Sequence, residues 1–354
     1  MRYVNVIGTV GVPACYGGFE SLVENLLDYT PDDVKYTVFC SSKKYDKRVD
    51  IYKNAKLVYI NNKANGKESI IYDLKSMKLS LKANIMLILG VSGCIFLPFI
   101  RKNFKGKIIT NIDGLEWKRT KWNFIIKWFL HYSEKQAVRY SDVIIGDNKG
   151  ITDYVWDSYK KKAVLIAYGG DHVIKVKNDL LYKSYSFCKN KYAITVCRIE
   201  PENNVHIILE AFSKLENNSI VIVGNWNNSK YGRELKEKYS NIKNMHLLES
   251  IYDPEIINWL RGNAYVYIHG HSAGGTNPSL VEAMNFGLPI LAYNCIYNRA
   301  TTDNKCFYWS NCQELEYIMN IKTDSFSETG KKMHELGSKR YTWSTIAQQY
   351  NSLY

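Results

Sequence analysis

Several signals that would assign a chain to a particular class are missing from this one. Its eight cysteines include no C-x-x-C pair, which excludes both the usual zinc spacing and the framework of a disulfide-stapled domain. The chain also has no D-x-D pair, the usual metal-dependent clamp for a diphosphate. We therefore expect neither a metal ion nor a disulfide framework, and a reducing compartment fits best.

Segments that would direct the chain into or across a membrane are missing as well. The first residues, 1–14, combine a short strand with a loop and lack the apolar stretch and cleavage region of a signal peptide. The most apolar segment, Ile85–Ile100, is interrupted by Gly90, Gly93 and Pro98, which leaves it too short and too broken for a membrane span. We predict a cytoplasmic protein.

Positive charge is present in excess and is unevenly distributed. The chain has 354 residues, a length typical of two domains, and a formal net charge of +13. Residues 1–168 hold 27 Lys and Arg against 16 Asp and Glu, so nearly all of the excess lies in the first half. Such a field favours an anionic partner, either a phosphate-bearing membrane surface or nucleic acid. On charge alone, an ordinary solvated basic surface is equally compatible.

Short apolar runs alternate with helical patterns along the whole chain, which predicts an α/β fold with parallel sheets. The expected strands are 3–9, 35–40, 57–60, 85–89, 107–111, 143–145, 163–167, 192–197, 219–223, 245–248, 265–269 and 289–293. The expected helices include 19–29, 122–140, 204–215, 230–240, 253–261 and 278–286.

The alternating pattern restarts after Tyr168-Gly169-Gly170-Asp171, which marks a domain boundary. We predict an N-terminal Rossmann-like domain at 1–168 and a second one at 169–340. The last segment, 341–354, is expected to pack back on the N-terminal domain. Two doubly wound domains in tandem would face a central cleft, where ligands usually bind.

The strongest functional signal runs from Tyr267 to Met284, where a strand leads into a glycine-rich loop and then a helix. Asn277 suits the N-cap and Pro278 the first helical position. Backbone N–H groups and the helix dipole make the turn 276–280 a predicted diphosphate site. Glu282, one turn further on, is placed to accept hydrogen bonds from ribose hydroxyls. The alternative is an ordinary loop that starts a helix with a surface Glu.

With these motifs the chain resembles the family-4 retaining glycosyltransferases of the GT-B fold, over nearly its whole length. Residues 16–20, Tyr-Gly-Gly-Phe-Glu, are similar to the family's glycine loop against the donor phosphates. Residues 198–203 are similar to its R-x-x-P-E-K segment, which implies that Arg198 contacts the diphosphate. The resemblance assigns donor binding to Gly17, Gly18, Arg198, His271, Gly274, Gly275, Thr276, Asn277, Ser279 and Glu282.

Within that family, the likeness is closest to bacterial rhamnosyltransferases of cell-surface polysaccharide assembly. It is carried by Gly11–Leu26, Asn111–Arg119 and Gly274–Met284. It implies transfer of a sugar, best L-rhamnose from dTDP-rhamnose, to a saccharide acceptor that is lipid-linked, with retention of configuration. No cofactor is implied, since the nucleoside-diphosphate sugar is a co-substrate. Another hexose or deoxyhexose donor remains open.

Two positions depart from the family pattern. Many members carry a second Glu eight residues before the one at Glu282, and this chain has Gly274 there. The phosphate-binding Lys of the R-x-x-P-E-K segment is Asn203. The first departure suits a donor other than an ordinary hexose, and a front-face mechanism, because no enzyme nucleophile is evident.

Candidate catalytic residues lie in the segment Asn111–Arg119, which follows a predicted strand. Asp113 and Glu116 could activate an acceptor hydroxyl, because carboxylates within hydrogen-bond reach act as general bases. The alternatives are a turn Asp beside Gly and a helix-capping Glu. His172 is expected to stabilise the domain junction, and His269 and His271 have no spacing that suggests a metal site.

Basic and aromatic side chains are interleaved at the start of the helix expected at 122–140. This pattern suits contact with anionic lipid on the inner face of the cell membrane, or with the acceptor. It also suits single-stranded nucleic acid, but no nucleic-acid motif accompanies it, so no nucleic acid is expected. A mostly buried helix is the equal alternative, because apolar residues spread almost around its axis. The residues concerned are Lys118, Arg119, Trp122, Lys127 and Trp128.

Two other functions share these features. A nucleotide-sugar epimerase can have the same two-domain architecture, since fold does not fix function. Such an enzyme needs carboxylates and a His placed for elimination, and no such set is evident. A non-enzymatic protein that binds nucleotide sugar or nucleic acid is the third reading, prompted by Gly274, Asn203 and the positive charge.

Overall fold

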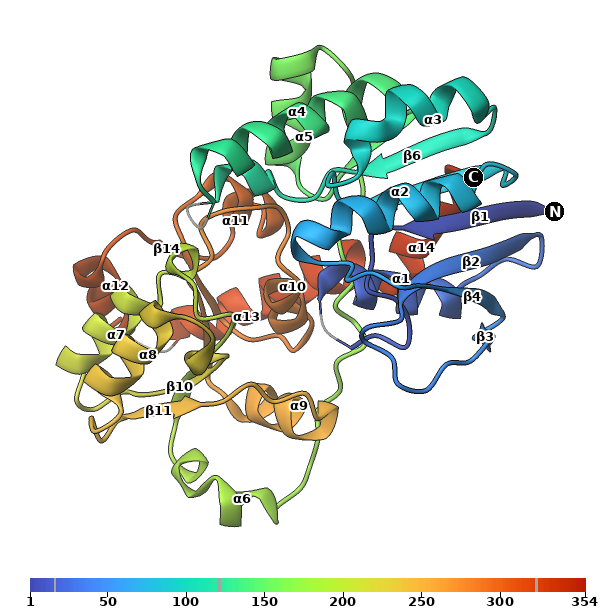
Figure 1. The fold of residues 1–354 in the computed structure, drawn as a ribbon. Helices are drawn as coiled ribbons and strands as arrows, with labels where there is room; N and C mark the ends of the chain where they lie inside the picture. Colours follow the sequence, from blue (N-terminus) through green and yellow to red (C-terminus); the bar gives the residue numbers. More distant parts are fainter. Residues whose placement is uncertain (16, 120–121, 322–323) are drawn as a thin grey trace. The chain divides into compact units, whose positions relative to one another are not determined.

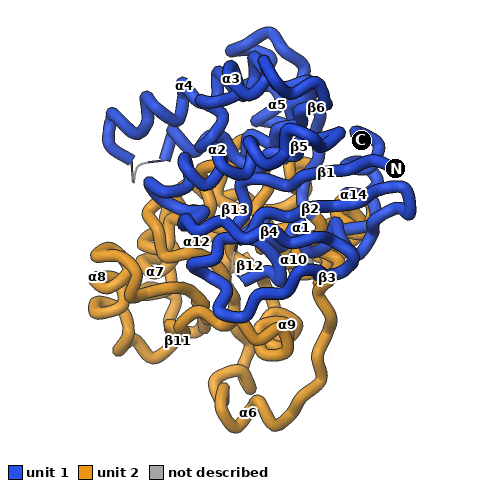
Figure 2. Tube along the Cα trace, turned by 45° about the vertical axis from the view of Figure 1, so that its right-hand side comes forward, with its two compact units in different colours: residues 1–168, 343–354 blue, residues 169–342 orange. Residues whose placement is uncertain are grey.

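The computed structural model describes residues 1–15, 17–119, 122–321 and 324–354, so Tyr16 of the predicted glycine loop lies outside the described residues. The chain divides into two α/β units, coloured separately in Figure 2. The first unit comprises residues 1–168 together with 343–354, and the second comprises 169–342.

The first unit is built on an eight-stranded sheet in the order β3-β4-β2-β1-β5-β6-β7-β8. All neighbours pair in parallel except β3 and β4, which are antiparallel. The central strands are buried on both faces because helices cover them, and every side chain of Ile85–Leu89 is in the core. The strands are β1 (Arg2–Ile7), β2 (Val34–Ser41), β3 (Ile51–Tyr52), β4 (Ala55–Ile60), β5 (Ile85–Leu89), β6 (Lys107–Asn111), β7 (Val143–Gly146) and β8 (Val164–Leu165).

The helices of this unit include one from the far end of the chain. They are α1 (Gly18–Asp28), α2 (Ser69–Leu79), α3 (Leu97–Asn103), α4 (Phe124–Tyr140), α5 (Lys149–Tyr159) and α14 (Trp343–Ser352). Helices α3, α4 and α5 lie together beside β6 (Figure 1). Trp343, Ile346 and Tyr350 of α14 are buried, and the Tyr350 hydroxyl accepts a hydrogen bond of 2.9 Å from the Asn111 amide. Helix α14 is therefore part of the first unit's core.

The second unit has a six-stranded, fully parallel sheet in the order β11-β10-β9-β12-β13-β14. Its strands are β9 (Tyr192–Val196), β10 (Ser219–Val223), β11 (Met245–Leu248), β12 (Val266–His269), β13 (Ile290–Tyr293) and β14 (Phe307–Trp309). Its helices are α6 (Leu181–Ser184), α7 (Val205–Lys214), α8 (Lys230–Tyr239), α9 (Pro254–Asn263), α10 (Pro278–Asn285), α11 (Ile296–Thr301), α12 (Cys312–Met319) and α13 (Asp324–Arg340). Both units thus have the doubly wound architecture expected of Rossmann-like domains.

Predicted and observed elements differ mainly where the apolar pattern is short. The run expected as a strand at 163–167 contributes only Val164 and Leu165, whose side chains are exposed because β8 is an edge strand. Strands β3 and β14, of two and three residues, were not predicted. The helix expected from Trp122 begins at Phe124, because the Asn123 side chain caps it by accepting from the Ile126 N–H.

Candidate functional site

The candidate donor site of the second unit lies where its strand order reverses. Strand β9 is flanked by β10 on one side and β12 on the other, so the loops after β9 and β12 both leave the sheet at this switch point. Ligands of open α/β sheets bind at this position. Arg198 follows β9, and the loop 270–277 follows β12.

The helix that follows this loop has the predicted cap. Asn277 is the N-cap of α10, its side chain accepts a hydrogen bond of 2.9 Å from the Ser279 N–H, and Pro278 is the first helical residue. The Leu280 N–H also donates, to the Asn277 carbonyl, so two N–H groups of the predicted diphosphate turn already have partners within the protein. The cap satisfies donors that a diphosphate was expected to use. The helix dipole still favours an anion at this end.

Glu282 is held between a guanidinium and an imidazole that the sequence did not suggest as its partners. Arg261 of α9, itself 5% exposed, places its guanidinium 2.6 Å from Glu282 Oε2. The imidazole Nε2 of His172 lies 3.3 Å from Oε1. Burial raises the pKa of Glu282, but the charge of Arg261 and the hydrogen bond to His172 outweigh it and hold the pKa below its ordinary value. Glu282 is therefore a fixed, ionised acceptor.

The segment that carries His172 packs directly on the backbone of α10. A Cβ on Gly170 would lie 2.6 Å from the carbonyl carbon of Val281 and 2.8 Å from the Glu282 N. Only glycine allows this approach. His172, expected to stabilise the domain junction, contacts the candidate ribose-binding carboxylate within the second unit.

The loops after β9 and β12 are joined by a buried hydrogen-bond network. Asn203 donates to the Arg198 carbonyl over 2.7 Å, and its side-chain oxygen lies 2.8 Å from Nδ1 of His271. The Ser272 N–H and hydroxyl both donate to the Glu202 carbonyl. Asn203 is 4% exposed, so a Lys in its place would have to bury a charge. Asn203 therefore joins the two loops.

The remaining predicted donor residues of the second unit lie in or beside these loops. Arg198 has a side chain 39% exposed, and its closest carboxylate, Glu200, is 3.9 Å away, so the guanidinium remains open to solvent. Gly274 has a φ of 105°, a conformation that favours glycine, while Gly275 and Thr276 are buried. A Glu at position 274 would be strained in this loop.

His269, at the end of β12, is a core residue rather than a site residue. It is 3% exposed, stacks on Tyr267, and its Nε2 has no hydrogen-bond partner among the described residues. Burial lowers its pKa to about 3, so it is neutral throughout the physiological range.

In the first unit, Asp113 follows β6 in a strained turn. Asp113 and Leu115 have φ values of 58° and 43°, both in the left-handed region. The Asp113 N–H donates to the Asn111 side chain over 3.0 Å, and Asn111 is in turn bonded to Tyr350. Asp113 is half-buried and remains the better candidate for a base.

Glu116 and Arg119, predicted as a candidate base and as a membrane or acceptor contact, are paired with each other. Arg119 lies 2.7 Å from Glu116 Oε2, and the Trp122 indole donates to Oε1 over 3.1 Å. These contacts occupy the carboxylate, so it is poorly placed to take a proton from an acceptor. Arg119 was expected to contact the membrane or the acceptor. It is 9% exposed, so it cannot lie against a membrane surface.

A buried carboxylate that sequence reasoning missed anchors the same segment. Glu134 of α4, 1% exposed, accepts hydrogen bonds from Trp117 Nε1 at 3.1 Å and from the hydroxyls of Tyr154 and Tyr159 at 2.6 and 2.7 Å. These bonds hold the end of the Asp113 turn to α4 and α5. An apolar helix pattern with one Glu on it gave no sign of this arrangement.

The predicted glycine loop of the first unit is held by another buried Glu. Glu20 accepts hydrogen bonds from the Val10 N–H and the Thr9 hydroxyl, and burial raises its pKa despite them. Gly17 has a φ of 122°, and a Cβ there would lie 2.1 Å from a Glu20 carboxylate oxygen. Gly18 meets only the Tyr168 ring, at ordinary contact distance.

The first half of α4 is exposed, which removes the buried-helix alternative for that part. Phe124, Ile125 and Trp128 are 82%, 73% and 62% exposed. Trp128 stacks on the exposed Tyr132. Lys118 is exposed and Lys127 half-buried. We call Phe124, Ile125, Trp128 and Tyr132 the α4 apolar face.

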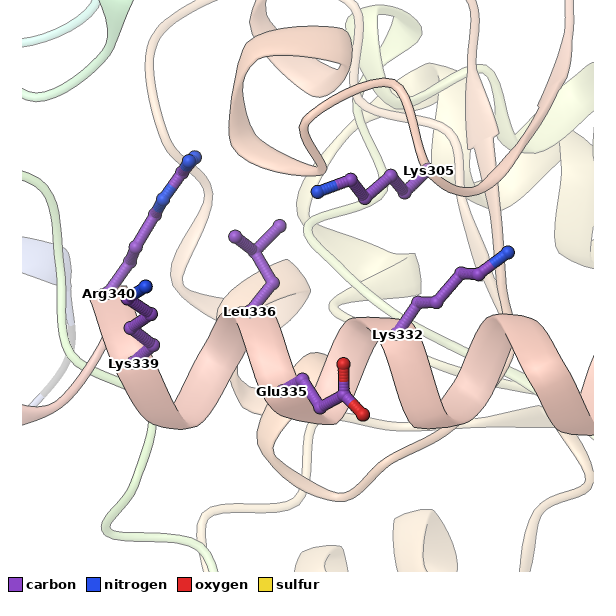
Figure 3. Close-up of a pocket in the computed structure, with 6 residues that line it drawn as sticks. All are labelled: Lys305, Lys332, Glu335, Leu336, Lys339 and Arg340. Carbon is purple, nitrogen blue, oxygen red and sulfur yellow. The ribbon is translucent and has the colours of Figure 1, made fainter.

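A basic groove of about 490 Å³ lies elsewhere in the second unit, along α13 (Figure 3). Lys332, Glu335, Leu336, Lys339 and Arg340 line it from α13, and Lys305 reaches toward them from the segment before β14. Lys305 and Arg340 already pair with Asp303. The groove contains none of the predicted site residues.

Two absences among the described residues bear on the site. Among them, no group of three or more His, Cys, Asp or Glu side chains is arranged to hold a metal ion. Within the same residues, no helix combines the length and apolarity that crossing a membrane requires.

Comparisons with known proteins agree with this division into units. Residues 1–171 match a domain of unknown function, DUF1972, and residues 181–304 match the family "glycosyl transferases group 1". A comparison with curated proteins gives no match.

Solved structures with the same fold cover the whole chain at low identity. Sucrose-phosphate synthase from Thermosynechococcus elongatus gives a TM-score of 0.84 at 14% identity, covering 100% of this chain and 98% of its own. HepE from Anabaena in complex with UDP-glucose gives a TM-score of 0.76 at 14% identity, and the match covers 100% of this chain and 99% of HepE. The catalytic domain of starch synthase IV from Arabidopsis thaliana, bound to ADP and acarbose, gives a TM-score of 0.72 at 11% identity. This match covers 99% of this chain and 98% of that domain.

These likenesses show a GT-B fold, with two Rossmann-like units. The match over residues 181–304 includes the loops after β9 and β12, α10 and its Glu282. The chain is a glycosyltransferase.

Proposed function

We propose that the second unit binds a nucleoside-diphosphate sugar at the β9/β12 switch point and that the enzyme transfers the sugar to a saccharide acceptor. The observation that carries this is Glu282, ionised and fixed by Arg261 and His172 beside the capped N-terminus of α10. A carboxylate so placed can accept a hydrogen bond from the nucleotide's pentose, and the helix end and Arg198 favour the diphosphate. Solved proteins of this fold carry UDP-glucose or ADP, which supports the donor class.

Asp113 is proposed as the residue that activates or orients the acceptor hydroxyl. Its turn is held rigidly through Asn111 at one end and Trp117 at the other, which is the preorganisation that a general base needs. Preorganised donors around the diphosphate would stabilise the leaving group, so no metal ion is required by this scheme.

For the sugar we propose L-rhamnose from dTDP-rhamnose, moved with retention in the assembly of a bacterial surface polysaccharide. Support comes from the resemblance carried by Gly11–Leu26, Asn111–Arg119 and Gly274–Met284. The positive φ of Gly274, which would strain a Glu, agrees with a donor sugar that does not need a second Glu at that position. Another hexose or deoxyhexose is the alternative that a donor panel would reveal.

We further propose that the acceptor is lipid-linked and that the α4 apolar face rests on the inner surface of the cell membrane. Aromatic side chains with lysines beside them are typical of interfacial helices. The net charge of +11 in residues 1–168 complements anionic headgroups.

The decisive experiment is a transfer assay with a panel of nucleotide sugars, including dTDP-rhamnose, and lipid-linked monosaccharide acceptors. Product NMR gives the linkage and the anomeric configuration. We expect Glu282→Ala and Arg198→Ala each to lower kcat/KM about tenfold or more, since each removes a hydrogen bond to a charged group. Glu210→Ala, which removes an exposed carboxylate of α7, is the matched control and should leave the rate unchanged. Failure of every nucleotide sugar to bind would refute the proposal, and turnover of the donor without acceptor would indicate an epimerase.

A further inference from the structure

Glu282 has two carboxylate oxygens, and they lie in different surroundings. Oε2 is 2.6 Å from Arg261, whose side chain is 6% exposed, so this oxygen faces the protein interior. Oε1 is 3.3 Å from His172, whose side chain is 43% exposed, so this oxygen faces the open side. Because its partner is the exposed one, Oε1 is the oxygen on the side from which a ligand would approach.

The interior partner is fixed by more than one contact. Arg261 comes near the end of α9, and its guanidinium also reaches the Ser279 hydroxyl at 3.4 Å. Ser279 is in the first turn of α10, one turn before Glu282, so Arg261 joins α9 to two successive turns of α10. The rest of the Glu282 surroundings is rigid too, because Gly170 packs against its backbone N.

A carboxylate oxygen accepts about two hydrogen bonds, and one position on Oε1 is already taken by His172. One position therefore remains for a ligand. Resting on the proposed function, we propose that Arg261 is a positioning residue and His172 a specificity-determining one, so that Glu282 receives a single hydroxyl of the nucleotide's pentose. The site should thus accept 2′-deoxyribonucleotide donors about as well as ribonucleotide donors.

The test uses the full chain and pairs of diphosphates that differ only at the 2′ position: UDP and dUDP, ADP and dADP, and GDP and dGDP. Isothermal titration gives the ratio of the two dissociation constants within the pair that binds. We expect wild-type ratios within about threefold, because no hydrogen bond distinguishes the two nucleotides. A wild-type preference of tenfold or more for the ribonucleotide would overturn the inference.

His172→Ala probes specificity at an exposed position that does not disturb the core. It releases the second position on Oε1, so a ribonucleotide should gain a hydrogen bond to a charged acceptor and be favoured by about tenfold or more. An unchanged ratio, with nucleotide still bound, overturns the specificity role and leaves the proposed function standing. If no nucleotide of any pair binds the wild type, the proposed function itself fails.

Arg261→Met and Arg261→Lys separate positioning from simple support. Removing the charge leaves Glu282 buried without its counter-ion, so affinity for both members of a pair should fall about tenfold or more with their ratio unchanged. Arg261→Lys keeps a cation and should restore most of the affinity, together with part of the thermal stability that Arg261→Met loses. Equal affinity in Arg261→Met and wild type would refute the positioning role, and Tm measurements identify any variant that does not fold.

Discussion

Glu134 offers the sharpest test of how the Asp113 turn is held. Its carboxylate is buried and accepts three hydrogen bonds, two at Oε1 from tyrosine hydroxyls and one at Oε2 from Trp117. In Glu134→Gln, the amide oxygen can keep the Trp117 indole while the amide NH₂ faces the two tyrosine hydroxyls, which can accept as well as donate. The negative charge that strengthened all three hydrogen bonds is lost. We expect a loss of about 1.5–3 kcal/mol in the free energy of unfolding of the first unit, the cost of a hydrogen bond to a charged group.

Two further variants turn this estimate into a ranking. Glu134→Ala removes all three bonds and should cost about 3–5 kcal/mol, because buried donors are left unsatisfied. Tyr159→Phe removes one bond and leaves the carboxylate with two partners, so it should cost about 1–2 kcal/mol. Urea unfolding gives the free energies, and hydrogen exchange of residues 111–119 shows whether the turn loosens in the same order. A Glu134→Gln variant within 0.5 kcal/mol of wild type, with unchanged exchange, would refute the reasoning.

Three further predictions follow from single contacts. Gly170→Ala forces a Cβ to within 2.6 Å of the α10 backbone and should cost about 1–3 kcal/mol in unfolding free energy. Gly262→Ala is the control, because the nearest neighbour of its new Cβ is a ring atom of Phe286 at 3.6 Å. Equal losses of stability in the two variants would contradict the packing argument. Replacing Phe124 and Trp128 by Ser should weaken co-sedimentation with phosphatidylglycerol vesicles at least about tenfold. Tyr317→Ser, which removes a similarly exposed aromatic of α12, should leave vesicle binding unchanged. Equal vesicle binding by the two variants would exclude the α4 apolar face as a membrane contact. Because the pKa of His269 is about 3 when folded and about 6.5 when unfolded, the unfolded chain binds an extra proton between these values, so stability falls with falling pH by up to about 1.4 kcal/mol per pH unit. His269→Phe should flatten that slope in urea titrations at pH 4 to 6, and an unchanged slope would show that other groups carry it.

The sheet strands were predictable because their pattern is local. Ile85–Leu89 and Ser219–Val223 are uninterrupted apolar runs, and their observed bounds match the predicted ones. Asn277 and Pro278 carry the capping chemistry in adjacent residues, and the cap was predicted for that reason. The same local reasoning overestimated the strand at 163–167, whose edge position leaves it little to pair with.

The candidate site was predictable only in part, because its contacts join residues far apart in sequence. Arg261 stands 21 positions before Glu282 and, in the sequence, looks like an ordinary basic residue at the end of a helix. The burial of Glu134 depends on Trp117 from the segment after β6 and on Tyr154 and Tyr159 from α5. By contrast, the pairing of Glu116 with Arg119 has a spacing of three residues and could have been anticipated.

Helix α14 has a consequence for how the chain matures during synthesis. The first unit needs Ile346 and Tyr350 in its core, yet these residues are translated only after all 174 residues of the second unit. Until then, the nascent first unit lacks a core helix, and the Asn111 amide at the base of the Asp113 turn lacks its hydroxyl partner. The turn that carries the proposed base is thus completed only after the whole second unit has been translated, so a product truncated before α14 would lack this hydroxyl partner.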